Sequence, residues 1–129
     1  MPGGRPAIME REATPLADTE LVARLFRALG DATRIRIVEL LVDEGELHQM
    51  EIVRRIGATQ ARVSEHMACL VWCGFVEART QGRRTFYRVS NRRVRTLLEK
   101  AKQFLKQNEA QIATCRRVDG ASEAHSRYR

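Results

Sequence analysis

Two cysteines four residues apart carry the most specific chemistry in this chain. Cys69 and Cys73 fall within residues 59–74, where the residue pattern predicts a helix. On a helix, residues at positions i and i+4 have Cβ atoms about 5–6 Å apart. That separation suits two thiolates that share one metal ion, because a zinc–sulfur bond is about 2.3 Å and bonds to larger ions are longer. It is too wide for an easy disulfide, which needs Cβ atoms about 3.8 Å apart.

A third cysteine, Cys115, ends the last predicted helix. If that helix packs across a dimer, Cys115 arrives from the other subunit and completes a three-sulfur site. Three sulfurs without histidine or carboxylate favour soft, thiophilic ions. We therefore expect Cys69, Cys73 and Cys115 to bind a divalent inducer, Cd²⁺ or Pb²⁺, with Hg²⁺ as a further candidate. The plainer alternative is that these cysteines are small core residues.

Composition narrows the class of protein. The 129 residues correspond to one domain, and a net charge of +7 with a pI of about 10.1 favours a polyanionic partner, first of all nucleic acid. The sequence contains no run of about 18 apolar residues, so no membrane span is predicted. The N-terminal residues lack the apolar centre of a signal peptide, so we expect a cytoplasmic protein with reduced thiols. The sequence shows no phosphate loop, no paired carboxylates and no Cys/His dyad, so we do not expect an enzyme.

The hydrophobic periodicity predicts a winged helix-turn-helix of the mainly α (α+β) class, with additional N- and C-terminal dimerisation helices. Residues 1–16 are expected to form a flexible arm, 17–115 the DNA-binding and dimerisation domain, and 116–129 a flexible tail. The expected elements are a helix capped by Asp18, a helix from Asp31 to Gly45, a helix over 49–56, a helix over 59–72, a hairpin over 75–90 and a helix over 92–115.

The expected core positions follow from the same periodicity. The apolar faces of the second and third helices are Ile35, Val38, Leu41, Val42, Met50, Ile52, Val53 and Ile56. In the fourth helix, Val63, Met67 and Leu70 form one stripe, and a second stripe holds Arg62, His66, Cys69 and Cys73.

The turn at Gly57-Ala58 marks the fourth helix as a recognition helix, whose first residues point at base edges. The candidate DNA contacts there are Thr59, Gln60, Ala61, Arg62, Ser64 and His66, and the hairpin tip adds Arg83 and Arg84. Gln suits adenine, Arg suits guanine or phosphate, and a narrow basic tip suits phosphates or a minor groove. The alternatives are a solvated tip and a winged helix used only for protein contacts.

Three segments resemble the ArsR/SmtB family of metal-responsive repressors. Residues 26–37, FRALGDATRIRI, are similar to the family's opening signature, 59–67, TQARVSEHM, to its recognition helix, and 82–87, GRRTFY, to its wing. The resemblance covers roughly 21–115. It implies a homodimer that binds operator double-stranded DNA when metal-free and dissociates when metal-loaded, derepressing metal-resistance or efflux genes.

Within the family, residues 66–74 resemble the cadmium- and lead-sensing CmtR-like branch, in which a cysteine pair on the recognition helix is joined by a distal cysteine. Cys115 matches that cysteine by distance and order only. Two other sensing sites of the family lack their ligands here, because residues 47–51 contain no cysteine and the last helix contains no histidine. The alternative function is a thiol-based, redox-responsive transcriptional regulator of the same fold.

Overall fold

Five helices and a three-stranded sheet make up residues 14–118, the part of the chain that the computed structural model describes. These residues belong to two units, one that runs to residue 92 and one that begins at residue 93. The first unit holds α2 (Thr14–Leu29), α3 (Ala32–Glu44), β1 (Leu47–His48), α4 (Gln49–Ile56), α5 (Gln60–Trp72), β2 (Val76–Gln81) and β3 (Arg84–Val89). The second holds all but the first residue of α6 (Arg92–Ala113).

The ends of α3, α4 and α5 lie where capping chemistry places them. Asp31 accepts a 3.0 Å hydrogen bond from the backbone N–H of Arg34, and Thr59 accepts a 3.1 Å bond from that of Arg62. Gly45 and Gly57 follow α3 and α4 with φ of 92° and 79°, which a residue with a Cβ rarely adopts. The predicted helix boundaries around the helix-turn-helix are thus confirmed.

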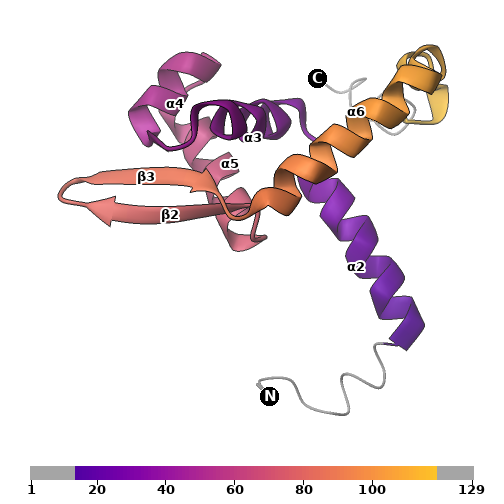
Figure 1. The fold of residues 1–129 in the computed structure, drawn as a ribbon, viewed down its shortest axis with the longest axis horizontal. Coiled ribbons are helices and arrows are strands. Elements are labelled where there is room, and N and C mark those ends of the chain that lie inside the picture. The colour runs from indigo at the N-terminus through magenta and orange to yellow at the C-terminus, as the bar shows by residue number, and fades with distance from the viewer. Residues whose placement is uncertain (1–13, 119–129) are drawn as a thin grey trace. The chain divides into compact units, whose positions relative to one another are not determined.

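The sheet is antiparallel with strand order β1-β3-β2, and its β2–β3 hairpin forms the wing. In Figure 1 the wing extends past α3, α4 and α5. The turn at its tip is Gly82-Arg83, and Gln81 pairs with Arg84, as the predicted hairpin requires. β1 was not predicted, because its only two residues pair with Tyr87 and Phe86, which are distant in sequence.

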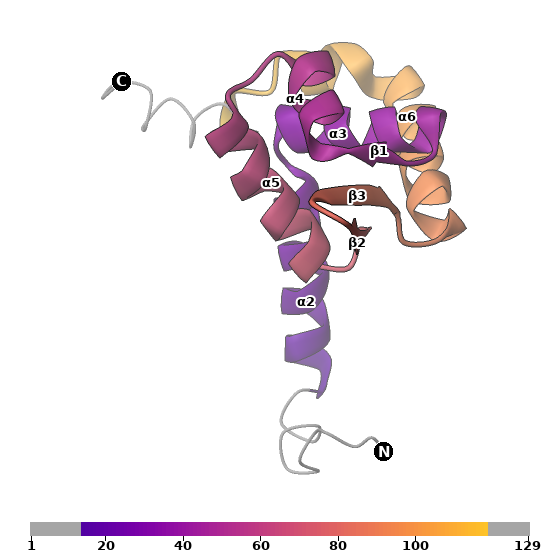
Figure 2. The same ribbon diagram turned by 90° about the vertical axis from the view of Figure 1, so that its left-hand side faces the viewer.

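The core lies where α3, α4 and α5 pack against the wing strands; Figure 2 shows α5 and the sheet beneath α3 and α4. Val38, Leu41, Ile52 and Ile56 are buried as predicted. The prediction for Met50 is wrong, since its side chain is 43% exposed, while Ile37, which was not predicted, is fully buried. The largest fully buried side chains are Ile37, Leu41, Ile52, Met67, Leu70, Val38, Val63 and Val76.

The terminal helices differ from their predicted bounds. α2 begins at Thr14, four residues before the expected Asp18 cap, and α6 ends at Ala113, so Cys115 lies beyond it. Both helices carry exposed large apolar side chains, which are Leu21, Val22, Leu25 and Phe26 on α2 and Phe104, Leu105 and Ile112 on α6. The expected arm and tail lie mostly outside the described residues. None of the described helices is long and apolar enough to span a membrane.

Candidate nucleic-acid interface and thiol pair

The first turn of α5 presents polar and basic side chains to solvent. Gln60, Ala61 and Arg62 are exposed, and Thr59 caps the helix with its hydroxyl oxygen. A recognition helix uses its N-terminal residues to contact base edges, so this turn has the surface that direct readout requires. The DNA contacts expected at these four residues stay predictions.

Ser64 is exposed but already has a partner. Gln49 Nε2 donates to Ser64 Oγ at 2.9 Å, and the Tyr87 hydroxyl donates to Gln49 Oε1 at 3.0 Å. Burial raises the pKa of Tyr87, which keeps its hydroxyl protonated and able to donate. Gln49 therefore joins the wing to the recognition helix, a role that its position at the start of a predicted helix does not reveal. The Ser64 hydroxyl retains a proton that it can donate.

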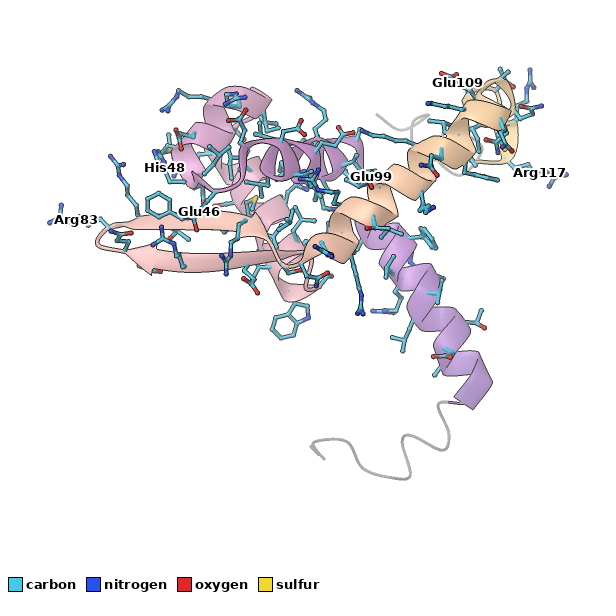
Figure 3. The ribbon with its side chains drawn as sticks, viewed as in Figure 1. Glu46, His48, Arg83, Glu99, Glu109 and Arg117 are labelled. Atoms are coloured by element: carbon cyan, nitrogen blue, oxygen red, sulfur yellow. The ribbon has the colours of Figure 1, made fainter. Side chains whose placement is uncertain are left out.

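Arg83 and Arg84 are exposed at the wing tip, and Figure 3 shows Arg83 directed away from the end of the hairpin. The base of the wing is held by Arg79, whose guanidinium donates to both carboxylate oxygens of Glu46 at 2.8 and 2.9 Å. The same guanidinium lies 4.7 Å from the centre of the Phe86 ring. Hydrogen bonding to Arg79 lowers the pKa of Glu46. A bidentate pair of this kind fixes orientation as well as distance.

His66 does not lie on the exposed face that the helical projection assigned to it. It is only 9% exposed, and Arg34 Nη1 donates to its Nδ1 at 3.2 Å. Since a guanidinium can only donate, Nδ1 accepts and the ring proton lies on Nε2, 4.0 Å from Asp31 Oδ1. His66 therefore has a structural contact where a DNA contact was expected, because its side chain is buried and its Nδ1 accepts a hydrogen bond from Arg34 of α3.

Arg34 also connects α5 to α2. Its Nε donates to the carbonyl oxygen of Ala28, near the end of α2, at 2.6 Å. The Arg34 side chain thus connects the middle of α5, the recognition helix, to the end of α2. Burial raises the pKa of Asp31, but hydrogen bonds from the Arg34 and Thr33 backbones and the positive charge of Arg34 oppose it, so the net pKa is lowered.

The thiol pair occupies the last turn of α5. Cys69 is half-buried and Cys73 is exposed, and the Cys73 backbone N–H donates to the Cys69 carbonyl at 2.9 Å, the i to i+4 bond of a regular helix. Burial, the neighbouring Cys69 and a hydrogen bond between the two thiols raise the pKa of Cys73. The charges of Arg34 and Arg24 oppose that rise. The two residues lie one helical turn apart and are at least partly open to solvent, as two ligands of one ion must be.

Cys115 belongs to the second unit and is half-buried. Among the described residues, no group of three or more His, Cys, Asp or Glu side chains is arranged to hold a metal ion. A third sulfur ligand beside Cys69 and Cys73 is therefore part of the proposal below.

Comparison with known proteins identifies the family. A model described as "Bacterial regulatory protein, arsR family" matches residues 31–78. The chain is 37% identical over 121 residues to a Streptomyces lividans protein named "Probable mercury resistance operon repressor", covering 92% of this chain and 96% of the relative. The chain belongs to the ArsR family. It is a winged helix-turn-helix, DNA-binding transcriptional regulator and not an enzyme.

Two further likenesses bear on this ArsR-family protein. It is 40% identical over 70 residues to the transcriptional regulator CmtR of Mycobacterium tuberculosis, over 54% of this chain and 58% of the relative. The solution structure of a homodimeric winged helix-turn-helix DNA-binding domain from Mycobacterium bovis is similar, with a TM-score of 0.67 and 27% identity over 81% of this chain and 91% of that one. The resemblance seen in residues 26–37, 59–67 and 82–87 is confirmed.

Proposed function

We propose that this ArsR-family protein is a cytoplasmic, homodimeric, metal-responsive repressor. It binds operator DNA when metal-free and dissociates when a thiophilic divalent ion is bound, which derepresses metal-resistance genes. The observation that carries the proposal is the layout of α5, whose first turn is exposed and polar and whose last turn bears two adjacent thiols. One short helix thus carries both the DNA-reading residues and the ligands of the inducer.

The DNA contacts in this proposal come from two elements. Thr59, Gln60, Ala61 and Arg62 begin α5 and lie where base edges are read, with Ser64 one turn further along. Arg83 and Arg84 at the wing tip contact phosphates or the adjacent minor groove. A net charge of +7 supplies the general attraction to a polyanion.

The thiol pair fits a soft metal ion by its donor set. Cys69 and Cys73 would hold the ion, and Cys115 of either subunit would add a third sulfur. Once bound, the ion draws the deprotonated sulfurs into one coordination shell. The relative named for mercury resistance favours mercury, and the CmtR-like residues favour cadmium and lead. Cadmium and lead favour more sulfur donors than mercury does, so Cys115 matters most for them.

Arg34 gives the thiol pair a physical connection to the rest of the protein. Its side chain contacts His66, three residues before Cys69, and the Ala28 carbonyl of α2. A shift of the last turn of α5 on metal capture therefore changes the setting of α5 against α2. Coupling free energies of about 1–3 kcal/mol, or roughly 5- to 150-fold in affinity, are typical of allosteric proteins.

A second copy of the chain is the proposed cover for the exposed apolar side chains of α2. Leu21, Val22 and Phe26 are all more than half exposed, which is unfavourable for an isolated chain in water. The similar homodimeric domain supports this assembly. Two copies present two recognition helices, which suits an operator with two half-sites.

The proposal is tested with reduced, metal-free protein and a DNA duplex enriched from a random pool by that protein, called the selected duplex below. Addition of Hg²⁺, Cd²⁺ or Pb²⁺ is expected to produce sulfur-to-metal absorption and to release the duplex over the same range of metal. Zn²⁺, which is a less thiophilic ion, serves as the comparison. Metal binding without release of DNA would contradict the proposal.

A thiol-based redox regulator is the second candidate, because Cys69 and Cys73 lie one helical turn apart and Cys73 is exposed to solvent, where an oxidant can react. It predicts that mild oxidation releases the selected duplex and that the released protein has lost two hydrogen atoms by mass to the oxidant, as one new disulfide requires. The proposed metal sensor predicts release by metal in the presence of excess reductant. The two outcomes separate the candidates.

A further inference from the structure

An open hollow of about 530 Å³ lies between α4, the first residue of α5 and the tip of the wing. His48 and Arg54 line it from the α4 side, Gln60 from the start of α5, and Arg83 and Arg84 from the wing. Figure 3 shows His48 on the side of the wing that faces α4. Met50, which the sequence pattern assigned to the core, also lines this hollow, and that position explains its exposure.

The walls of the hollow are basic. Three arginines and a histidine contribute to them, and no lining residue is acidic. His48 has a carboxylate beside it, since Glu51 Oε1 lies 3.7 Å from His48 Nε2. Such a concentration of guanidinium groups with little compensating charge attracts an oxyanion, and guanidinium donors match the geometry of phosphate oxygens.

Two adjacent arginines of α4 differ in their surroundings. Arg55 donates to Glu44 Oε2 at 3.1 Å and is thereby engaged within the protein. Arg54 lines the hollow, and no carboxylate in the described part of the chain forms an ion pair with it. Arg54 and Arg55 therefore form a matched pair for mutation. Both are exposed arginines of α4, but only Arg54 lines the hollow.

We propose that this hollow is the seat of a DNA backbone phosphate, held between Arg54 of α4 and Arg84 of the wing. The inference rests on the proposed DNA-binding function and deepens it. Phosphate contacts set the position of a protein on DNA, and base contacts specify the sequence. Because Gln60 borders the same hollow, a phosphate seated there sets how far the first turn of α5 enters the groove.

The test compares Arg54→Ala with Arg55→Ala in the full-length, reduced, metal-free protein. Affinity is measured across a salt series for the selected duplex and for a scrambled duplex of equal length. One lost phosphate contact lowers the slope of log affinity against log salt by about 0.9 for B-DNA. The homodimer loses one such contact in each subunit, so Arg54→Ala is expected to show about twice that change and to weaken both duplexes by a similar factor. Arg55→Ala is expected to leave slope and affinity unchanged.

Two further measurements keep the result decisive. Arg54→Lys retains the charge and is expected to retain the wild-type slope, and circular dichroism shows whether each variant is folded. An unchanged slope in Arg54→Ala, or a loss confined to the selected duplex, overturns the phosphate seat while DNA binding by the wild type stands. A wild-type protein that binds neither duplex overturns the proposed function and the phosphate seat together.

Discussion

The two ends of α5 share a helix but have opposite chemistry. The first turn is exposed, polar and basic, with Gln60 and Arg62 facing solvent and Thr59 as its cap. The last turn bears Cys69 and the almost fully exposed Trp72, and Cys73 follows as the C-terminal cap. Between them, His66, Met67 and Leu70 are buried.

The contrast teaches that the middle of α5 is an anchor and that its ends are the working surfaces. Leu70 and Met67 fix the helix by packing, and the Arg34–His66 hydrogen bond fixes it by polar contact. A rigid helix only about 20 Å long transmits a displacement of one end to the other, because its backbone hydrogen bonds resist bending. The proposed sensor and reader therefore need no separate linking element.

The largest expected effect is on the sensing end alone. Cys69→Ser and Cys73→Ser are each expected to lower affinity for the soft metal by about 100-fold, since each ligand carries roughly 3 kcal/mol of a strong metal site. Affinity of the metal-free variants for the selected duplex is expected to stay within about twofold of wild type. Metal titration followed by sulfur-to-metal absorption, beside a DNA titration, checks both.

Cys115→Ser is the matched control for that pair. It removes one thiol from the second unit and leaves α5 intact. A larger loss for cadmium and lead than for mercury supports Cys115 as an additional ligand. Wild-type binding of all three ions by this variant would restrict the site to the α5 pair.

The reading end is tested by Arg62→Ala. Loss of one base-reading guanidinium is expected to cost about 1–3 kcal/mol of binding to the selected duplex, or roughly 5- to 150-fold in affinity. Metal affinity is expected to be unchanged, because Arg62 is exposed at the opposite end of α5 from the thiols. Fluorescence anisotropy with labelled duplex measures the first quantity. If metal affinity falls equally, the two ends of α5 are not separate surfaces.

The anchor between the ends is tested by Arg34→Gln. Without the bonds to His66 and Ala28, the ratio of DNA affinities in the metal-free and metal-loaded states is expected to fall toward one from a value typical of allosteric coupling. Metal-free DNA binding and metal binding themselves are expected to persist. Arg36→Gln is the control, since Arg36 also donates to a backbone carbonyl, that of Ile56, but not to His66. Wild-type coupling in Arg34→Gln would refute this role.

The smallest expected effect concerns Asp31, which caps α3 and faces His66. Asp31→Ala is expected to lower the free energy of unfolding by about 1 kcal/mol, measured by denaturant at constant protein concentration. Because the folded-state pKa of Asp31 is lowered from 3.8, ionisation stabilises the fold above pH 4 and that contribution is lost as the pH falls through the lowered pKa.

Asp31→Asn separates the cap from the charge. Asn is about as good a cap as Asp, so this variant is expected to lie close to wild type in stability. Any loss of unfolding free energy relative to wild type is expected at neutral pH, and this loss is expected to shrink as the pH falls. A deficit that grows as the pH falls would contradict the assigned direction of the Asp31 pKa.

Local features of this protein could be predicted from the sequence because they depend on residues close together in the chain. The i to i+4 spacing of Cys69 and Cys73, the caps Asp31 and Thr59, and the turn at Gly82 each follow from neighbouring residues and backbone geometry. The recognition-helix bounds followed for the same reason. The alternation expected along the wing is not seen in β2, where every residue after Val76 is exposed.

Contacts between distant residues were decided by the tertiary structure. His66 turned inward because Arg34, 32 residues earlier, provides a donor there, and Ser64 is paired because Tyr87 and Gln49 are brought together across 38 residues. Arg54 and Arg84 border one hollow only because the wing folds beside α4. A helical projection gives the direction of each side chain, but whether that direction leads to water, to a partner or into the core depends on how the elements pack.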